Sequence, residues 1–208
     1  VNGTRGKSSV TRLIAAGLRA GDIKTFAKTT GSSPRFIDSN GDDHVIQRFR
    51  PASIGEQIRM IIRFAKHSPK AIVMECMAVQ PQYQWVSEHK ILQSNYGVLT
   101  NVRADHLEEM GYSLNHIAKS LSNTVPCNQK FFTSEDENYQ TLEDKSIKNN
   151  STFFLSSGKQ LDKKFLEGFP FIEHPDNIAL ALDICEDLGV ENDPVSYTHL
   201  TLPTNREV

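Results

Sequence analysis

The residues with the most evident chemistry stand at the start of the chain, which reads Gly3-Thr4-Arg5-Gly6-Lys7-Ser8-Ser9. Glycines permit a tight turn whose successive N–H groups face an anion, and a helix that follows adds the positive end of its dipole. Lys7 would reach the β/γ-phosphates of a nucleotide, and Ser8 would hold Mg²⁺. The full P-loop pattern has a glycine where this chain has Val1, so the motif is a shortened form. A Gly-rich turn with an exposed lysine is the alternative interpretation.

Three further polar groups each follow an apolar segment. They are the run Thr29-Thr30-Gly31-Ser32, the acid Glu75 after Ala71-Ile72-Val73-Met74, and the run Thr100-Asn101-Val102-Arg103-Ala104-Asp105-His106. Each has a structural alternative: an ordinary turn, an ion pair for Glu75, a helix cap for Asp105, or a structural histidine. Ligands of parallel α/β sheets lie beyond the carboxyl ends of the strands, so their common placement predicts that they converge with the loop.

Hydrophobic periodicity predicts the elements that position these groups. We expect helices at 8–20, 53–65, 83–91, 113–121, 136–147 and 176–188, and strands at 23–29, 44–49, 71–74, 96–102, 130–133 and 152–155. Strands that alternate with helices indicate an α/β fold, here a P-loop mononucleotide-binding fold whose largely parallel sheet has helices on both faces.

The expected helix at 53–65 carries two specific predictions. Ser53 and Glu56 have the spacing of a capping box, in which each side chain bonds a backbone amide of the first turn. The buried face is expected to consist of Ile54, Ile58, Ile61, Ile62 and Ala65.

The bulk composition excludes several classes of protein. The net charge of −2 argues against a dedicated nucleic-acid binder. Three widely spaced cysteines, Cys76, Cys127 and Cys185, indicate a reducing compartment with buried thiols rather than disulfides or a zinc site. No apolar run in the sequence is long enough to span a membrane.

Five segments occur in order along the chain: GTRGKSS, TTGSSPR, VMECMAVQP, TNVRADHLEEMG and EHPDNIALAL. Together they resemble the Mur ligase superfamily, whose members use ATP to join an amino acid or peptide to a carboxylate. The longer runs GTRGKSSVTRLIAAGLRAG, TTGSSPRFID and ECMAVQPQYQW resemble its poly-γ-glutamate synthase branch. The resemblance extends from Val1 to about Asp193.

The resemblance implies a role for particular residues. Lys7, Glu75 and His106 would be catalytic, and Ser8, Glu75 and His106 would bind Mg²⁺ ions. The ATP-binding set would be Gly3, Thr4, Arg5, Gly6, Lys7, Ser8, Ser9 and Asn177, the last of these near adenine. Asn101 and Arg103 are weaker candidates for the wall of the site. Lys119 stands where many relatives carry a carbamylated lysine, although its spacing from His106 favours an ordinary surface lysine.

The implied reaction is an ADP-forming amide ligation that makes poly-γ-glutamate for a capsule or extracellular polymer through an acyl phosphate. Its substrates would be glutamate and the growing chain, and its cofactors ATP and Mg²⁺. Small membrane subunits would be the partners, at the cytoplasmic face of a bacterial plasma membrane. The alternatives are a folylpolyglutamate or cell-wall ligase, or a plain P-loop ATPase.

We expect the chain to be truncated at both ends. Only Val1 and Asn2 precede the loop, so most of the strand that normally leads into a P-loop would be missing. Residues 1–194 would then be a fragment of the Mur-type ATP-binding central domain, with little activity without its C-terminal partner domain. Residues 195–208 resemble a translated sequencing-library adapter, so we expect this tail to be non-native.

Overall fold

The computed structural model describes residues 1–31, 33–48, 52–161, 166 and 173–190. The tail expected to be non-native, 195–208, lies outside this range. The α-helices are α1 (Lys7–Ala20), α2 (Gly55–Ala65), α3 (Pro81–Val86), α4 (Leu107–Met110), α5 (Leu114–Leu121), α6 (Tyr139–Lys148) and α8 (Pro175–Asp187), and a π-helical turn, Ser87–Leu92, follows α3. The strands are β1 (Thr25–Thr29), β2 (Arg35–Ile37), β3 (Asp43–Val45), β4 (Ala71–Met74), β5 (Tyr96–Leu99), β6 (Lys130–Thr133) and β7 (Thr152–Leu155).

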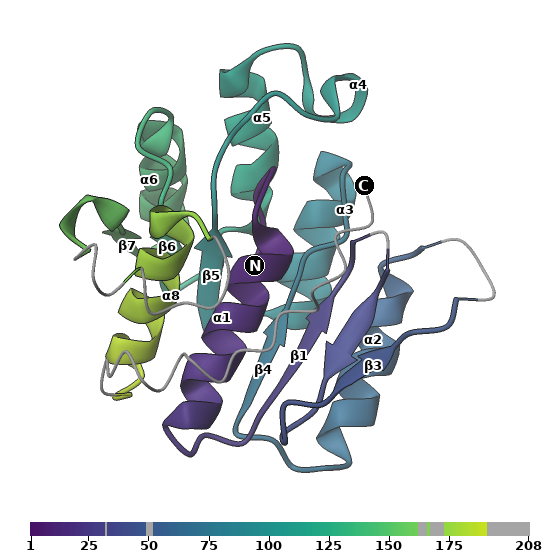
Figure 1. The fold of residues 1–208 in the computed structure, drawn as a ribbon. Helices are drawn as coiled ribbons and strands as arrows, with labels where there is room; N and C mark the ends of the chain where they lie inside the picture. The colour runs from purple at the N-terminus through teal and green to yellow at the C-terminus, as the bar shows by residue number, and fades with distance from the viewer. Residues whose placement is uncertain (32, 49–51, 162–165, 167–172, 191–208) are drawn as a thin grey trace.

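The strands form two neighbouring sheets, as Figure 1 shows. In the order β3-β2-β1-β4, β1 and β4 are parallel, whereas β2 and β3 are added antiparallel at the edge. The second sheet, β5-β6-β7, is parallel throughout. The predicted alternation of helices and parallel strands is therefore confirmed. The sequence prediction missed β2, and it placed the next strand at 44–49, whereas β3 ends at Val45.

Side chains of each strand alternate between cores on the two faces of the sheets. Ala27 packs with α1 and α8 on one face, whereas its neighbour Phe26 packs with α2 on the other. In the second sheet, Phe132 joins the α1/α8 core and Phe131 joins the core beneath α5 and α6. This period of two lets helices cover both faces, as the sequence predicted.

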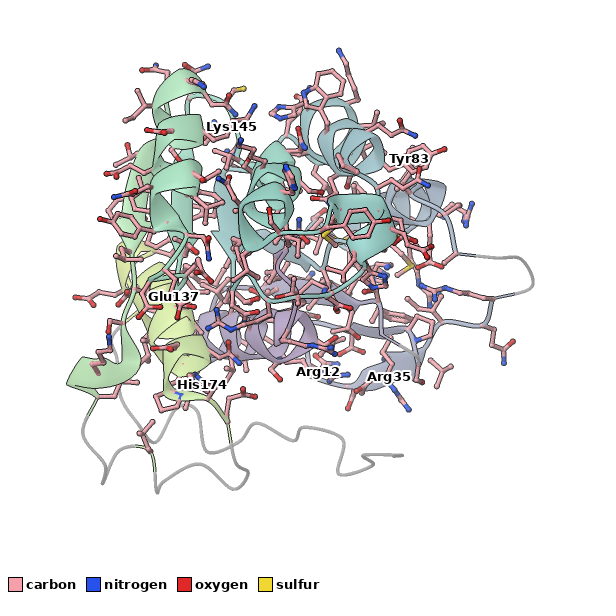
Figure 2. The ribbon with its side chains drawn as sticks, turned by 90° about the horizontal axis from the view of Figure 1, so that it is seen from above. Arg12, Arg35, Tyr83, Glu137, Lys145 and His174 are labelled. Carbon is pink, nitrogen blue, oxygen red and sulfur yellow. The ribbon has the colours of Figure 1, made fainter. Side chains whose placement is uncertain are left out.

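The hairpin of β2 and β3 is attached to α1 by charge. Asp43 lies 2.8 Å from the guanidinium of Arg12 and 3.5 Å from that of Arg35. Figure 2 shows the two arginine side chains together at this side of the molecule. These ion pairs attach the edge hairpin to α1, and the turn at Thr30, which leads into β2, lies near the N-terminal end of α1.

The buried face of α2 differs from the predicted one. Met60 and Phe64 are buried, whereas Ile58 and Ile62 have 46% and 57% of their surface exposed. The prediction was wrong for Ile58 and Ile62, whereas Ile61 does pack against this core. A helix rich in isoleucine has two apolar stripes, and only contact with β1 and β2 decides which of them is covered.

The predicted capping box is also absent. Ser53 contributes only its carbonyl, which accepts the amide of Glu56 at 2.9 Å. The Glu56 carboxylate instead takes two hydrogen bonds from Arg48, at 2.7 and 2.9 Å, and lies 2.9 Å from the ammonium of Lys28. Burial lowers the pKa of Lys28, and the bonds from Arg48 lower the pKa of Glu56 to about 2. Because the Lys28 side chain has no exposed surface, this carboxylate is required as its counter-ion.

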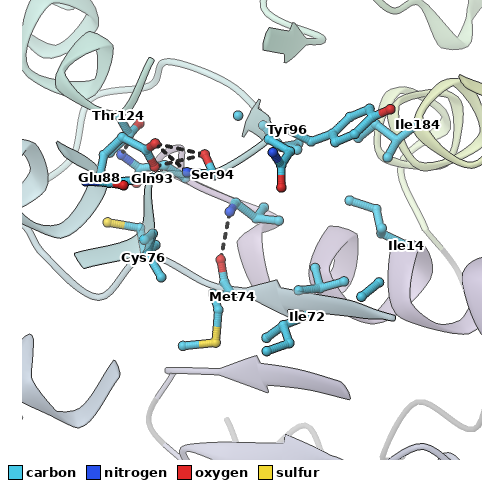
Figure 3. A pocket seen from close by; sticks show the side chains of 18 of the residues that line it. Ile14, Ile72, Met74, Cys76, Glu88, Gln93, Ser94, Tyr96, Thr124 and Ile184 are labelled. Atoms are coloured by element: carbon cyan, nitrogen blue, oxygen red, sulfur yellow. Dashed lines mark hydrogen bonds between the residues drawn. The ribbon is translucent and has the colours of Figure 1, made fainter. Parts of the chain in front are cut away.

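The chain enters the fold between the two sheets. Backbone hydrogen bonds of 2.7 Å join Val1 to Met74 at the end of β4 and to Cys76 just beyond it. On the other side, Asn2 bonds Val98 of β5 at 2.7 Å and Thr100 beyond it at 2.9 Å. Below this point the edges of β4 and β5 border a mainly apolar cavity of about 640 Å³ (Figure 3). Its walls include Ile14, Ile72, Tyr96 and Ile184. Val1 and Asn2 therefore lie in the strand position that the sequence predicts ahead of the loop.

No helix of the described residues is long and apolar enough to span a membrane. All three cysteines are free thiols; the prediction that they are buried is confirmed for Cys76 and Cys185 and is wrong for Cys127, which is exposed.

Two substitutions on α2 test which face of the helix is buried against the sheet. Phe64→Ala should lower the free energy of unfolding by about 3–5 kcal/mol, because Phe64 is fully buried between β1 and β2. Ile62→Ala should change it by less than about 0.5 kcal/mol. Urea denaturation followed by circular dichroism measures both, and equal losses would contradict the assignment of the buried face.

The lowered pKa of Glu56 should make the free energy of unfolding depend on pH in the acid range. The folded pKa of Glu56, about 2, lies below its ordinary 4.5, so the stabilisation is complete above pH 4.5 and is lost as the pH falls towards 2. Urea denaturation of the wild type should therefore show a steeper loss of stability over this range than denaturation of Glu56→Gln. Glu137→Gln, which alters an exposed carboxylate, is the matched control and should keep the wild-type slope. A wild-type slope in Glu56→Gln would disprove the linkage.

Candidate functional site

The loop ahead of α1 has the backbone of an anion-binding turn. Gly6 has a φ of 78°, and the first helical hydrogen bond runs from the Val10 amide to the Gly6 carbonyl at 2.9 Å. Within the described residues, the amides of residues 6–9 have no hydrogen-bond acceptor. The ammonium of Lys7 folds back onto the carbonyls of Gly3 and Thr4, at 2.7 and 3.3 Å. Four free donors at a helix N-terminus beside a lysine form a site for an anionic group.

Glu75 lies at the mouth of this loop, one residue beyond β4. Its carboxylate accepts the Ser8 hydroxyl at 2.7 Å, and the amide and hydroxyl of Thr30 at 2.8 Å each. The residue is 2% exposed, so these three donors fix its orientation. The structure therefore brings Lys7, Ser8 and Glu75 together, as the sequence predicted. Thr30 was predicted only as part of a hydroxyl-rich turn, whereas the structure shows it holding the acid.

His106 lies at the rim of the site. It has a φ of 45° at the N-terminus of α4, and its side chain is half exposed. Its ring lies 3.9 Å from Asp105, whose carboxylate is in turn 3.9 Å from the guanidinium of Arg5. In the described structure His106 forms no hydrogen bond or ion pair with Glu75 or Ser8. Its predicted role as a metal ligand stays a prediction.

Asn177 covers the loop from α8. A Cβ atom placed on Gly6 would lie 2.8 Å from the Asn177 side-chain nitrogen. That nitrogen donates to Glu173 at 2.7 Å, and Asn177 is 7% exposed. The structure thus joins Asn177 to the loop across a separation of about 170 residues, and its predicted contact with adenine stays a prediction.

The residues that follow β5 form the other wall of the loop. Asn101 and the backbone of Arg103 both bond Thr4. Buried Glu135 lies 3.3 Å from the Arg103 guanidinium and orients it. Lys119 is exposed on α5, which favours the ordinary surface lysine over a carbamylated one.

The oxygens of Ser8 and Glu75 fit a hard divalent cation. A hydroxyl and a carboxylate 2.7 Å apart are the ligand types that Mg²⁺ prefers when phosphate and water complete its shell. Across the described residues, no three His, Cys, Asp or Glu side chains gather closely enough to hold a metal by themselves. A cation here would therefore need further ligands beyond those that the described residues supply, such as phosphate and water oxygens.

Fold and site together define an α/β domain built around a phosphate-binding loop. The family model for the Mur ligase middle domain matches residues 1–182, so the chain belongs to the Mur ligase family through this domain.

Two curated relatives are similar over nearly the whole chain. The capsule biosynthesis protein CapB of Bacillus anthracis is 36% identical over 195 residues, which is 93% of this chain and 42% of the relative. The PGA synthase CapB of Bacillus subtilis (strain 168) is 33% identical over 205 residues, or 98% and 52% respectively. The chain therefore spans about half the length of these relatives.

Solved structures share the fold at low sequence identity. Escherichia coli FolC in complex with DHPP and ADP has a TM-score of 0.70 at 16% identity, covering 97% of this chain and 56% of that one. The bifunctional folylpolyglutamate synthase/dihydrofolate synthase of Yersinia pestis, complexed with AMPPNP and an Mn ion, has a TM-score of 0.68 at 14% identity, with 97% and 57% covered. These similarities confirm the predicted fold.

A pair of glycines tests the contact between the loop and α8. Gly6 and Gly189 have φ of 78° and 79°, but a Cβ at Gly189 would meet nothing within 4 Å. Alanine at either position should lower the free energy of unfolding by about 1–2 kcal/mol through backbone strain. Gly6→Ala should cost about 1 kcal/mol more, because Asn177 must move off Glu173.

Chemical denaturation of the single variants and of Gly6→Ala/Asn177→Ala measures this difference. The added Asn177→Ala substitution should remove the excess cost at Gly6. Equal losses for the two single glycine variants would contradict the packing of Asn177 on the loop.

Proposed function

We propose that the intact protein is an ATP-dependent amide ligase that forms poly-γ-glutamate through an acyl-phosphate intermediate. The observation that carries this proposal is the hydrogen bond between Ser8 and Glu75, directly beside Lys7. Two oxygens of the types that Mg²⁺ prefers thus lie together beside the loop, which supports the proposal. Membership of the Mur ligase family and 33–36% identity to the two CapB proteins support the class of substrate.

The reaction takes place in two steps. The γ-carboxylate of glutamate, or of the growing chain, attacks the γ-phosphorus of ATP, which gives an acyl phosphate and ADP. The amine of another glutamate then attacks the acyl carbon, the amide bond forms, and phosphate leaves. No side chain of the enzyme has to act as a nucleophile, so its contribution is orientation and neutralisation of charge.

The residues of the loop provide that contribution. The free amides at 6–9 face the triphosphate, and the Lys7 ammonium exchanges its carbonyl partners for phosphate oxygens. Ser8 and Glu75 would hold Mg²⁺, which when bound lowers the repulsion between the phosphates and an incoming carboxylate. Thr30 keeps the Glu75 carboxylate directed at this position.

Trapping with hydroxylamine tests the proposal. The intact protein, supplied with ATP, Mg²⁺ and glutamate or poly-γ-glutamate, should release ADP and form a γ-glutamyl hydroxamate. ADP release without a hydroxamate would identify a plain ATPase. A hydroxamate formed only with a folate or a cell-wall precursor would identify another Mur-type ligase. Either result would overturn the proposal.

We further propose that the intact protein works at the cytoplasmic face of the plasma membrane with small membrane subunits. The support is chemical: ATP is cytoplasmic, whereas the polymer of a capsule, the structure for which the Bacillus anthracis relative is named, lies outside the cell. Co-purification of the intact protein with membranes in the presence of such subunits, and not in their absence, is the expected result.

Lys7→Ala should lower the rate of ADP formation by roughly 10²–10³-fold, because it removes a preorganised charge beside the transferred phosphate. Lys24→Ala is the matched control, since in the described part of the chain the Lys24 ammonium bonds the carbonyl of His67 on the exposed surface, away from the loop. Coupled assay of ADP release measures both variants. A loss of less than about threefold for Lys7→Ala would contradict the role of the loop.

A further inference from the structure

Asn101 bonds the phosphate-binding loop through both its side chain and its backbone. Its side-chain oxygen accepts the Thr4 hydroxyl at 2.7 Å and the Arg5 amide at 3.1 Å. Its side-chain nitrogen donates to the Arg5 carbonyl at 3.1 Å. Its backbone carbonyl accepts the Thr4 amide at 3.0 Å. One side chain therefore satisfies both polar groups of the Arg5 backbone.

Neighbours of Asn101 hold the same part of the loop. The Thr100 hydroxyl donates to the Arg5 carbonyl at 2.6 Å, and the Arg103 amide donates to the Thr4 hydroxyl at 2.9 Å. Thr100 has no exposed surface, so its hydroxyl cannot exchange the loop for water. The segment after β5 thus holds Thr4 and Arg5, and among the described residues it forms no hydrogen bond with residues 6–9.

These hydrogen bonds divide the backbone amides of the loop into two sets. The N–H groups of Thr4 and Arg5 are directed at Asn101, whereas those of residues 6–9 have no acceptor in the described structure. The turn between the two sets is made at Gly6, where φ is 78°. An anion that approaches along the axis of α1 meets only the second set.

We propose that Asn101 is a positioning residue that holds Thr4 and Arg5 away from the bound phosphates, so that only the amides of residues 6–9 and Lys7 form the phosphate cradle. The inference rests on the proposed function, which requires a triphosphate in the loop. It goes beyond that function by stating which amides of the loop bind the phosphates and which are held by Asn101. Asn101 itself touches neither phosphate nor metal. It fixes the turn at Gly6, which sets the direction of the four free amides.

The test uses tripolyphosphate, a probe without adenine, and AMPPNP, each with Mg²⁺. In Asn101→Ala the dissociation constants of both probes, measured by calorimetry, should rise by about 10- to 100-fold, because the free amides lose their alignment. Thr100→Val, which removes a single hydroxyl at nearly constant shape, should weaken both probes by a smaller factor. Asn123→Ala is the matched control, since among the described residues its side chain bonds carbonyls of α5, at Lys119 and Ser120.

Amide NMR spectra supply a readout that a purely structural role would not change. Titration of the wild type with tripolyphosphate should shift the amide signals of residues 6–9 and leave those of Thr4 and Arg5 nearly in place. Hydrogen exchange at the Arg5 amide, whose acceptor is the Asn101 side chain, should be slow in the wild type and fast in Asn101→Ala. Exchange at the Thr4 amide should stay slower than at Arg5 in the variant, because its acceptor is the backbone carbonyl of residue 101. The thermal transition of each variant shows that it is folded.

Two results overturn the inference alone: wild-type affinity for tripolyphosphate in a folded Asn101→Ala, or large shifts at the Thr4 and Arg5 amides on titration of the wild type. If the wild type binds neither probe, the proposed function fails and the inference fails with it. These failures are distinguishable, because only the last of them appears in the wild-type calorimetry.

Discussion

The architecture depends on one constraint, the parallel pairing of Val1 and Asn2 with the strands on either side. Val1 is bonded to Met74 and Cys76, and Asn2 to Val98 and Thr100. The loop that follows must therefore emerge between Glu75 and Asn101, at the carboxyl ends of β4 and β5. Glu75 then meets Ser8 on one side, and Asn101 meets Thr4 and Arg5 on the other. A short stretch of backbone pairing thus assembles the site from segments that are far apart in the chain.

Buried polar groups next to the pairing keep it in register. The side chain of Asn2 donates to Gln84 and Thr124, and Gln84 in turn bonds Ser120 on α5. Further along, Gln57 of α2 accepts the Ser87 hydroxyl and approaches the Glu75 carbonyl. Each of these groups would lose a hydrogen bond if a helix shifted along the sheet. The helices behind the sheets therefore fix the position of Glu75 relative to the phosphate-binding loop.

Much of the fold could be predicted from the sequence because its signals are local. The apolar run of β4, the periodic residues of α1 and the cap at Ser113, which accepts the His116 amide, all lie where the patterns indicate. The errors have a common physical cause. Which isoleucines of α2 are covered, and whether Glu56 caps a helix or neutralises Lys28, depend on partners brought in from other strands.

The sequence by itself determined the chemistry: a shortened phosphate-binding loop, an acid directly after an apolar strand, and strands alternating with helices. These properties follow from residue type and spacing, which act over a few residues. Only the tertiary structure decided that Thr30 holds Glu75, that Asn177 covers Gly6, that His106 lies at the rim and that Asn101 grips the loop. A hydrogen bond forms between groups that are close in space, and closeness across β4, β5 and α8 is set by packing rather than by distance along the chain.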